Sequence, residues 1–317
     1  MNPATPASPT FRIGSRLAPM VAALASVAAP ADADARINVV ATLPDLAALA
    51  QAVGGSEVTI TALASASEDP HYVDPKPSLM LPLNRADLLI VNGLGLEDGW
   101  LGPLVTGARN GRIQPGAPGH LNASEYVQRI GGAMTGTDRA RGDVHPGGNP
   151  HYTYDPRAGL AVAKAIRDRL SKIDPAKAEV FATHYQQLAA DLEPLLQGPR
   201  DRITRLTAGR RSVVVYHQSL DYLLDWLGLT QAIAIEPQPG IPPTPGHVSR
   251  VLSTMKGSGT RVILQEEHYP RKTSQTLAKL ASGSLVVLHT ATRFREGESY
   301  VEHIRHMAEA IIDALKP

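Results

Sequence analysis

From residue 37 onward the sequence alternates short runs of β-branched and other apolar residues with longer amphipathic stretches. This alternation is typical of α/β layers and not of a β-sandwich or a helical bundle. The predicted fold class is therefore α/β with mainly parallel central sheets. Strands are predicted at residues 37–42, 58–63, 88–92, 212–216, 232–235, 261–265 and 285–288, with one more within 120–127.

One predicted helix, from residue 176 to about residue 206, is much longer than the others and is interrupted only near 198–199. At a rise of 1.5 Å per residue it spans on the order of 40 Å, so we expect it to link two lobes. The expected domains are an N-terminal lobe at 36–174, a rigid linking helix at 175–207 and a C-terminal lobe at 208–317. Other helices are predicted at 45–53, 77–85, 157–172, 220–227, 245–256, 272–281 and 300–315.

The first 35 residues are predicted to be a secretory signal peptide. Arg12 and Arg16 precede the apolar segment 17–30, and the small residues at 31–35 offer cleavage sites. The chain has no cysteine, which excludes disulfides, thiolate metal sites and a lipid-modified N-terminal cysteine. We therefore expect a periplasmic protein that is secreted through a cleavable signal and carries no lipid anchor.

The formal net charge is only +1, from 31 Lys and Arg against 30 Asp and Glu, and there is no long basic run. This balance argues against nucleic acid as a partner. Aromatic residues make up only 4% of the chain, so the core must be built mainly from aliphatic side chains.

Three of the eleven histidines, His71, His151 and His217, lie at strand ends or in loops fixed by proline. Two of them occupy nearly the same local sequence, Asp-Pro-His-Tyr and Asn-Pro-His-Tyr. Ligands of parallel α/β sheets bind beyond the carboxyl ends of the strands, where His71 and His217 are expected. Any one of the three alone would be an ordinary loop histidine, but three in matching contexts indicate metal ligands.

His289 follows the last predicted strand and is the candidate fourth ligand. His145 is either an accessory ligand that delivers metal or a solvated loop residue. The remaining histidines show no partner pattern, and those at 184, 303 and 306 are expected on solvated helix faces.

Three or four imidazoles without a thiolate suit Zn(II) better than Mg, Ca or Mn, which prefer oxygen donors. Asp69, Glu236 and Glu266 are candidate acceptors that orient the histidine rings.

The order and spacing of several motifs resemble the zinc and manganese solute-binding proteins of bacterial ABC transporters, the cluster A-I family. The resemblance covers essentially all of the chain after the signal peptide. Its motifs are Asp69-Pro70-His71 with Pro77-Ser78, 86–93 with Leu96-Glu97 and Trp100-Leu101, Asn149-Pro150-His151 with Asp155-Pro156, Tyr216-His217 with Tyr222-Leu223 and Gly228-Leu229, and Ile235-Glu236-Pro237.

The resemblance implies two α/β lobes joined by one long rigid helix, with the metal buried between them. It also implies that His71, His151 and His217 are ligands, and histidine at the third position is similar to the zinc members. Many relatives have an aspartate at the fourth position, where this chain has His289.

The function expected on these grounds is high-affinity binding of Zn(II) in the periplasm and delivery to an ABC-type membrane permease, by a monomer that is not an enzyme. A periplasmic metal chaperone is a second candidate partner. The alternatives are a manganese-binding member of the same family and a secreted zinc-dependent hydrolase, in which an open three-histidine site activates water. No H-E-x-x-H motif supports the hydrolase.

Overall fold

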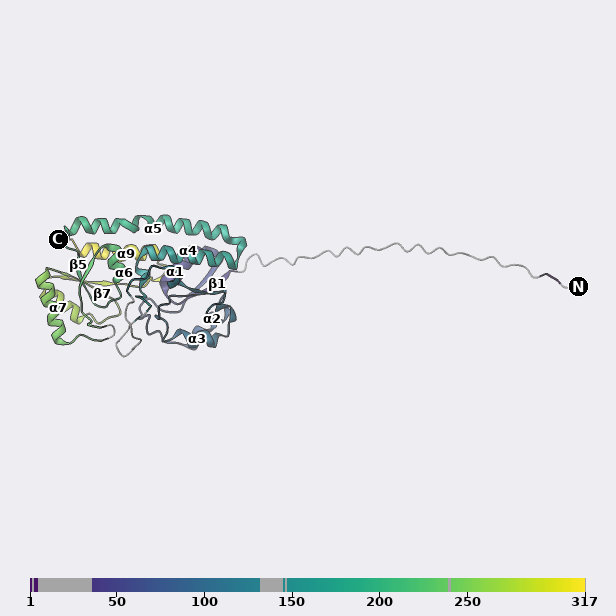
Figure 1. Ribbon diagram of the computed structural model, residues 1–317, viewed down its shortest axis with the longest axis horizontal. Helices are drawn as coiled ribbons and strands as arrows, with labels where there is room; N and C mark the ends of the chain where they lie inside the picture. Colours follow the sequence, from purple (N-terminus) through teal and green to yellow (C-terminus); the bar gives the residue numbers. More distant parts are fainter. Residues whose placement is uncertain (2, 5–35, 132–144, 146, 239–240, 317) are drawn as a thin grey trace. The chain divides into compact units, whose positions relative to one another are not determined.

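The computed structural model describes residues 1, 3–4, 36–131, 145, 147–238 and 241–316. The chain from Arg36 onward forms one compact unit, with a parallel four-stranded sheet in each of two lobes and the long helix α5 beside both (Figure 1). The predicted α/β fold class is confirmed. The boundaries at 36–174, 175–207 and 208–317 stay predictions. The predicted signal peptide lies almost wholly outside the described residues.

The sheet of the N-terminal lobe has the strand order β2-β1-β3-β4, and all its neighbours pair in parallel. Successive strands are added first on one side of β1 and then on the other, and ligands bind at the carboxyl edge of such a switch point. The elements of this lobe are β1 (Ile37–Ala41), α1 (Pro44–Gly54), β2 (Val58–Ala62), α2 (Met80–Arg85), β3 (Leu88–Val91), α3 (Leu101–Ala108), β4 (His120–Asn122) and α4 (Pro156–Ile173).

The sheet of the C-terminal lobe repeats this arrangement, with the order β6-β5-β7-β8 and parallel pairing throughout. Its switch point lies at β5. The elements are β5 (Ser212–Val215), α6 (Asp221–Leu227), β6 (Thr230–Ala234), α7 (Pro245–Ser258), β7 (Val262–Glu266), α8 (Lys272–Leu280), β8 (Ser284–Leu288) and α9 (Tyr300–Ala314).

Helix α5 (Ala178–Thr207) packs against α1 and α4 in one lobe and against α9 in the other (Figure 1). The predicted interruption near 198–199 is wrong, because α5 continues through Pro199. Proline has no N–H to donate to the carbonyl four residues earlier. The indole Nε1 of Trp226 donates to that carbonyl, on Leu195, at 2.9 Å. No helix in the described part of the chain, α5 included, is long and apolar enough to cross a membrane.

Hydrogen bonds join the two lobes directly. Asp45, at the start of α1, is buried, and its Oδ1 accepts from the backbone N–H and the hydroxyl of Thr292 at 2.7 and 2.6 Å. The hydroxyl of Tyr300 in α9 donates to the carbonyl oxygen of Thr153 at 2.8 Å. These buried bonds bring the loop after β8 and the start of α9 against the N-terminal lobe.

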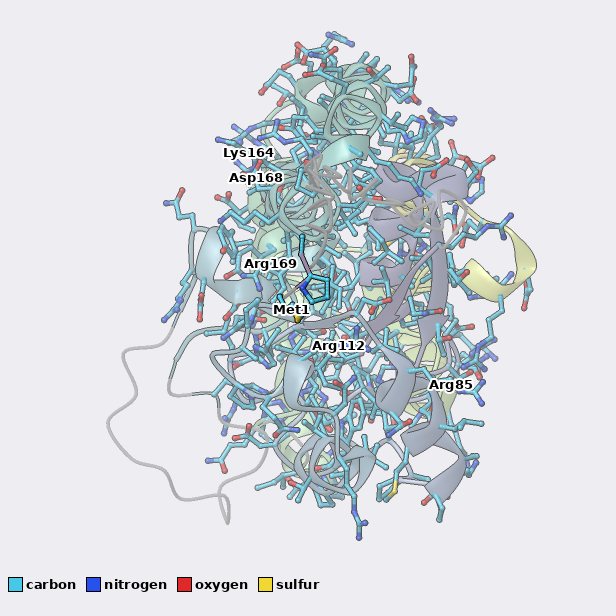
Figure 2. All side chains as sticks on the ribbon, turned by 90° about the vertical axis from the view of Figure 1, so that its right-hand side faces the viewer. Met1, Arg85, Arg112, Lys164, Asp168 and Arg169 are labelled. Carbon is cyan, nitrogen blue, oxygen red and sulfur yellow. The ribbon has the colours of Figure 1, made fainter. Side chains whose placement is uncertain are left out.

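Two arginines hold the outer end of the N-terminal lobe (Figure 2). Arg112 forms an ion pair with Asp87, the residue before β3, at 2.7 Å. Arg169 of α4 donates to the carbonyl oxygens of Pro118 and His120 at 2.6 and 2.5 Å. These contacts fasten β4, the last strand of the sheet order, to α4.

Candidate metal centre

The two proline-containing histidine motifs of the N-terminal lobe form the same local structure. The Oδ1 atom of Asp69 accepts from the backbone N–H of His71 at 3.0 Å and contacts its ring Nδ1 at 2.8 Å. Asn149 Oδ1 does the same for His151, at 2.9 and 2.8 Å. An Asp or Asn side chain that binds the backbone two residues on is an Asx turn, and the intervening proline fixes it. Each motif therefore sets both the position and the ring orientation of its histidine.

His217 follows β5 in the C-terminal lobe, and its Nδ1 lies 2.6 Å from Glu236 Oε2. Both side chains are buried. Asp69 and Glu236 therefore each accept from the ring of a histidine, as expected from the sequence. Glu266 instead accepts a short hydrogen bond from the hydroxyl of Ser219.

His145 is the fourth member of the group, and its Nδ1 lies 3.1 Å from the carbonyl oxygen of Leu94. Leu94 has a φ of +57°, between Gly93 and Gly95, which also have positive φ. A left-handed leucine costs about 1–2 kcal/mol. The strained backbone of the loop after β3 therefore presents the carbonyl oxygen of Leu94 to the ring of His145.

These four rings, from both lobes, form one continuous cluster. The ring centroid of His71 lies 5.2 Å from the centroid of His145 and 5.2 Å from that of His151. The centroids of His151 and His217 are 6.3 Å apart. The closest approach is between the Nε2 atoms of His71 and His145, at 3.1 Å. The structure therefore brings together three of the predicted ligands and adds His145.

The hydrogen bonds of the four rings fix the same tautomer in each neutral imidazole. Every Nδ1 faces an oxygen that accepts: Asp69, Leu94, Asn149 and Glu236 supply it. Each Nδ1 therefore carries the proton, and each Nε2 keeps its lone pair. Metal-binding histidines in proteins are oriented in this way, by an acceptor on the second ring nitrogen.

The contact between His71 and His145 fits a shared cation. At 3.1 Å the two nitrogens form a hydrogen bond when one ring carries a proton on Nε2, and a metal ion would take the place of that proton. Two donors that are each about 2.0–2.1 Å from a tetrahedral zinc ion lie about 3.3 Å apart, close to this distance. In the described ranges no three His, Asp or Glu side chains already surround one point at coordination distance. The other rings must therefore close in by small movements when an ion enters.

Burial lowers the pKa of one ring of the cluster, that of His151. Desolvation, followed by the charges of His71, His217 and neighbouring histidines, holds the pKa of His151 well below its ordinary value of 6.5. Burial raises the pKa of Asp69, but the hydrogen bonds from His71 outweigh it and the net pKa is lowered. At neutral pH the ring of His151 is therefore uncharged. The carboxylate of Asp69, which orients the ring of His71, is ionised.

A small cavity of about 30 Å³ lies beside the cluster, lined by His151, Tyr154 and His268 among others. A volume above about 10–15 Å³ accommodates one water molecule. His268 was not expected at the site, although it lies two residues after the end of β7. Its position close to the end of a strand was the available signal.

The buried carboxylate of Glu97, which belongs to one of the family motifs but was given no role from the sequence, organises the loops around the cluster. Glu97 accepts from the hydroxyl of Thr42 at 2.6 Å and from the backbone N–H groups of Asn92 and Gly93 at 2.6 and 3.0 Å. The side chain of Asn92 donates to the carbonyl oxygen of Pro150 at 2.9 Å. Glu97 thus ties the carboxyl end of β3 to the turn that carries His151.

The structure places His289 elsewhere. Its Nδ1 lies 2.6 Å from Glu267 Oε2, the Nη2 atom of Arg293 lies 2.8 and 3.0 Å from its two ring nitrogens, and its side chain is 48% exposed. Among the described residues, none of the four clustered rings is in contact with it. The geometry therefore does not support His289 as the fourth ligand, because its ring nitrogens contact Glu267 and Arg293 and not the cluster.

Residues 39–314 match the family described as zinc-uptake complex component A, periplasmic. The chain belongs to this family. It is a periplasmic metal-binding component that brings substrate to an ABC transporter, which implies a membrane permease as partner. The resemblance inferred from the sequence is confirmed, and so is the expectation of a transport protein instead of an enzyme, which removes the hydrolase alternative.

The relatives agree on metal binding and differ in the metal. The chain is 22% identical over 290 residues to the metal ABC transporter substrate-binding lipoprotein SloC of Streptococcus mutans, covering 89% of this chain and 91% of that protein. It is 24% identical over 284 residues to the manganese-binding lipoprotein MntA of Halalkalibacterium halodurans, covering 88% of each.

Solved structures share the fold. A crystal structure of ZnuA has a TM-score of 0.73 at 20% identity, covering 89% of this chain and all of that one. The manganese-bound periplasmic metal-binding protein of Candidatus Liberibacter asiaticus has a TM-score of 0.72 at 19% identity, over 89% of this chain and 100% of the other.

These relatives correct one expectation. The proteins from Streptococcus mutans and Halalkalibacterium halodurans are named lipoproteins, so the prediction that this protein carries no lipid anchor is contradicted. That prediction rested on the lack of cysteine, and the absence of one residue type does not decide how a protein is held at a membrane. A location outside the cytoplasm is consistent with the relatives.

Proposed function

We propose that the protein captures Zn(II) with His71, His145, His151 and His217 and hands it to its permease. The observation that carries the proposal is the convergence of four imidazole rings, with the Nε2 atoms of His71 and His145 only 3.1 Å apart. A divalent ion between these two nitrogens would replace their contact with two coordinate bonds. Action as a monomer, and a periplasmic metal chaperone as a further partner, stay predictions.

The choice of zinc rests on the donor set. Imidazole nitrogen suits zinc, whereas manganese prefers carboxylate and carbonyl oxygen. In this cluster the carboxylates of Asp69 and Glu236 lie against the Nδ1 atoms of His71 and His217 and so act on the rings. The runner-up is manganese, since MntA of Halalkalibacterium halodurans is named for it.

Competition between metal-free protein and a chromophoric chelator tests the choice of metal. Zinc is expected to bind the cluster at least about a hundredfold more tightly than manganese, because four nitrogen donors favour zinc in both the affinity order and geometry. An equal or tighter affinity for manganese would refute the zinc assignment and leave the family membership untouched.

Zinc affinity is also expected to fall as the pH drops through about 6.5, the ordinary pKa of histidine, because protons then compete for the Nε2 lone pairs. The low pKa of His151 keeps that ring available below this pH. The same competition, run from about pH 8 to about pH 5, measures the decline. A site built on carboxylates would keep its affinity until the pH approached about 4, and that result would contradict an imidazole site.

A further inference from the structure

The turn that carries His151 is also bonded to the other lobe, through the side chain of Asn149. The Oδ1 atom of Asn149 accepts from the backbone and the ring of His151, so the amide Nδ2 is the atom that can donate to further partners. Nδ2 donates to the backbone carbonyl oxygen of Gln218 at 2.9 Å and to Oδ2 of Asp221 at 3.1 Å. Gln218 follows His217, and Asp221 is the first residue of α6. One side chain therefore connects two of the clustered histidines, one from each lobe.

The partners of Asn149 require an amide at this position. The backbone N–H of His151 needs an acceptor, whereas the carbonyl of Gln218 and the carboxylate of Asp221 need a donor. Asparagine supplies both from one side chain. An aspartate in the same place would put an oxygen 2.9 Å from one accepting oxygen and 3.1 Å from another, and these contacts would repel.

The matching turn at His71 shows the contrast. Within the described residues, the hydrogen bonds of Asp69 are those to the backbone and ring of His71. A carboxylate is sufficient for this, because it only has to accept. The turn at Asn149 must also donate across the lobes. The two motifs, Asp-Pro-His-Tyr and Asn-Pro-His-Tyr, therefore differ at the one residue whose partners differ.

Helix α6 holds the same region of the N-terminal lobe at further points. The backbone N–H of Ile130 donates to the hydroxyl of Tyr222 at 2.9 Å, and the carbonyl oxygen of Ile130 accepts from the backbone N–H of Asn149 at 2.9 Å. Arg157 donates to Asp225 of α6 at 2.6 Å. These bonds keep α6 in a defined place against the turn, and the side chain of Asn149 extends them to the ring of a clustered histidine.

We propose that Asn149 is a positioning residue that couples the ring of His151 to the C-terminal lobe and so slows release of the bound ion. The inference rests on the proposed function, since it takes zinc as the cargo and His151 as a ligand. Oδ1 and Nδ2 belong to one planar amide. While Nδ2 is bonded to the C-terminal lobe, Oδ1 therefore stays against Nδ1 of His151. When the lobes separate at α6, the amide loses both of these partners, and the turn alone holds the ring.

A reciprocal exchange of Asn149 and Asp221 tests the coupling. Asn149→Asp keeps an oxygen for His151 but turns the donor into an acceptor, so zinc should dissociate about tenfold faster or more. Asp221→Asn keeps an acceptor for the amide of Asn149 and should change the rate by less than about threefold. In the double variant the amide at position 221 can donate to the carboxylate at position 149, so the rate should return to within about threefold of wild type. Stopped-flow transfer of zinc to an excess of a chromophoric chelator measures the rates.

Asp69→Asn is the matched control, because it exchanges the same two groups in the turn at His71. It should change the rate by the same factor with either residue at position 221, since the effects of independent sites add in free energy. Any direct effect of the charge at position 149 on the ion is also the same in both backgrounds, so it cancels in the comparison. Thermal melts of the metal-free variants check folding.

A double variant that releases zinc as fast as Asn149→Asp would overturn the coupling, and so would an unchanged rate in Asn149→Asp. A rescue of Asp69→Asn by Asp221→Asn would also overturn it, because a general change of charge would then explain the recovery. Failure of the proposed function would appear differently, as an unchanged zinc affinity in His217→Ala.

Discussion

His217→Ala is expected to lower zinc affinity by about 10²–10³-fold. Structural zinc sites with four ligands bind with about 10–16 kcal/mol, so one ligand contributes about 2.5–4 kcal/mol. His217 is the member of the cluster that the C-terminal lobe supplies, and it is buried and held through Nδ1 by Glu236. Its loss therefore removes a coordinate bond and also the link that draws the second lobe onto the ion. Chelator competition measures the affinity.

Two further variants make this result specific. Glu236→Gln keeps an acceptor for the His217 ring but removes the charge, so a smaller loss of about tenfold is expected. His247→Ala changes a histidine of the same lobe whose Nε2 lies 2.9 Å from the carbonyl oxygen of Ala234, and it should leave affinity unchanged. Thermal melts of the metal-free variants check folding. If His217→Ala bound zinc as tightly as wild type, the assignment of the site between the lobes would fail.

His145→Ala and His289→Ala are expected to behave in opposite ways at the site between the lobes. The Nε2 atom of His145 lies 3.1 Å from that of His71, so its removal should weaken zinc binding by about 10²-fold. His289 is half exposed and bound to Glu267, so its removal should change the zinc affinity by less than about twofold. Chelator competition measures both affinities.

The contrast between these two variants decides the fourth ligand. A large loss with His289→Ala and none with His145→Ala would restore the ligand set expected from the sequence and would require the loop after β8 to rearrange on binding. A loss with neither variant would indicate that water completes a three-histidine site. Comparison with the double variant shows whether the two histidines act independently, because independent effects add in free energy.

Local sequence was sufficient for the strands and for the repeated turn, although it predicted no helix at Leu101–Ala108, where α3 lies. The alternation of strand and helix patterns predicted every strand of both sheets, since strand and helix periodicity are local properties of the chain. The matching motifs at His71 and His151 pointed to a common role, and the structure gives the reason in one Asx turn used twice. Local rules failed at Pro199, where the freed carbonyl of Leu195 is satisfied by Trp226, a partner from a different helix.

The fourth position of the cluster shows what sequence could not decide. His289 and His145 were both candidates on their local patterns, and position after a strand favoured His289. The outcome depends on long-range contacts: Glu267 and Arg293 hold His289 away, while the left-handed backbone at Leu94 offers a carbonyl to His145. His303 is a similar case, since a helical histidine near the surface became buried by tertiary packing.

The sequence by itself determined the α/β class and the family, and it singled out three of the four clustered histidines, His71, His151 and His217, because patterning and turn chemistry depend on neighbouring residues. Only the tertiary structure decided which rings meet, which nitrogen of each ring faces inward and which acids orient them. These depend on side chains from both lobes, such as Glu236 on His217 and Leu94 on His145, whose separation in the chain carries no local signal.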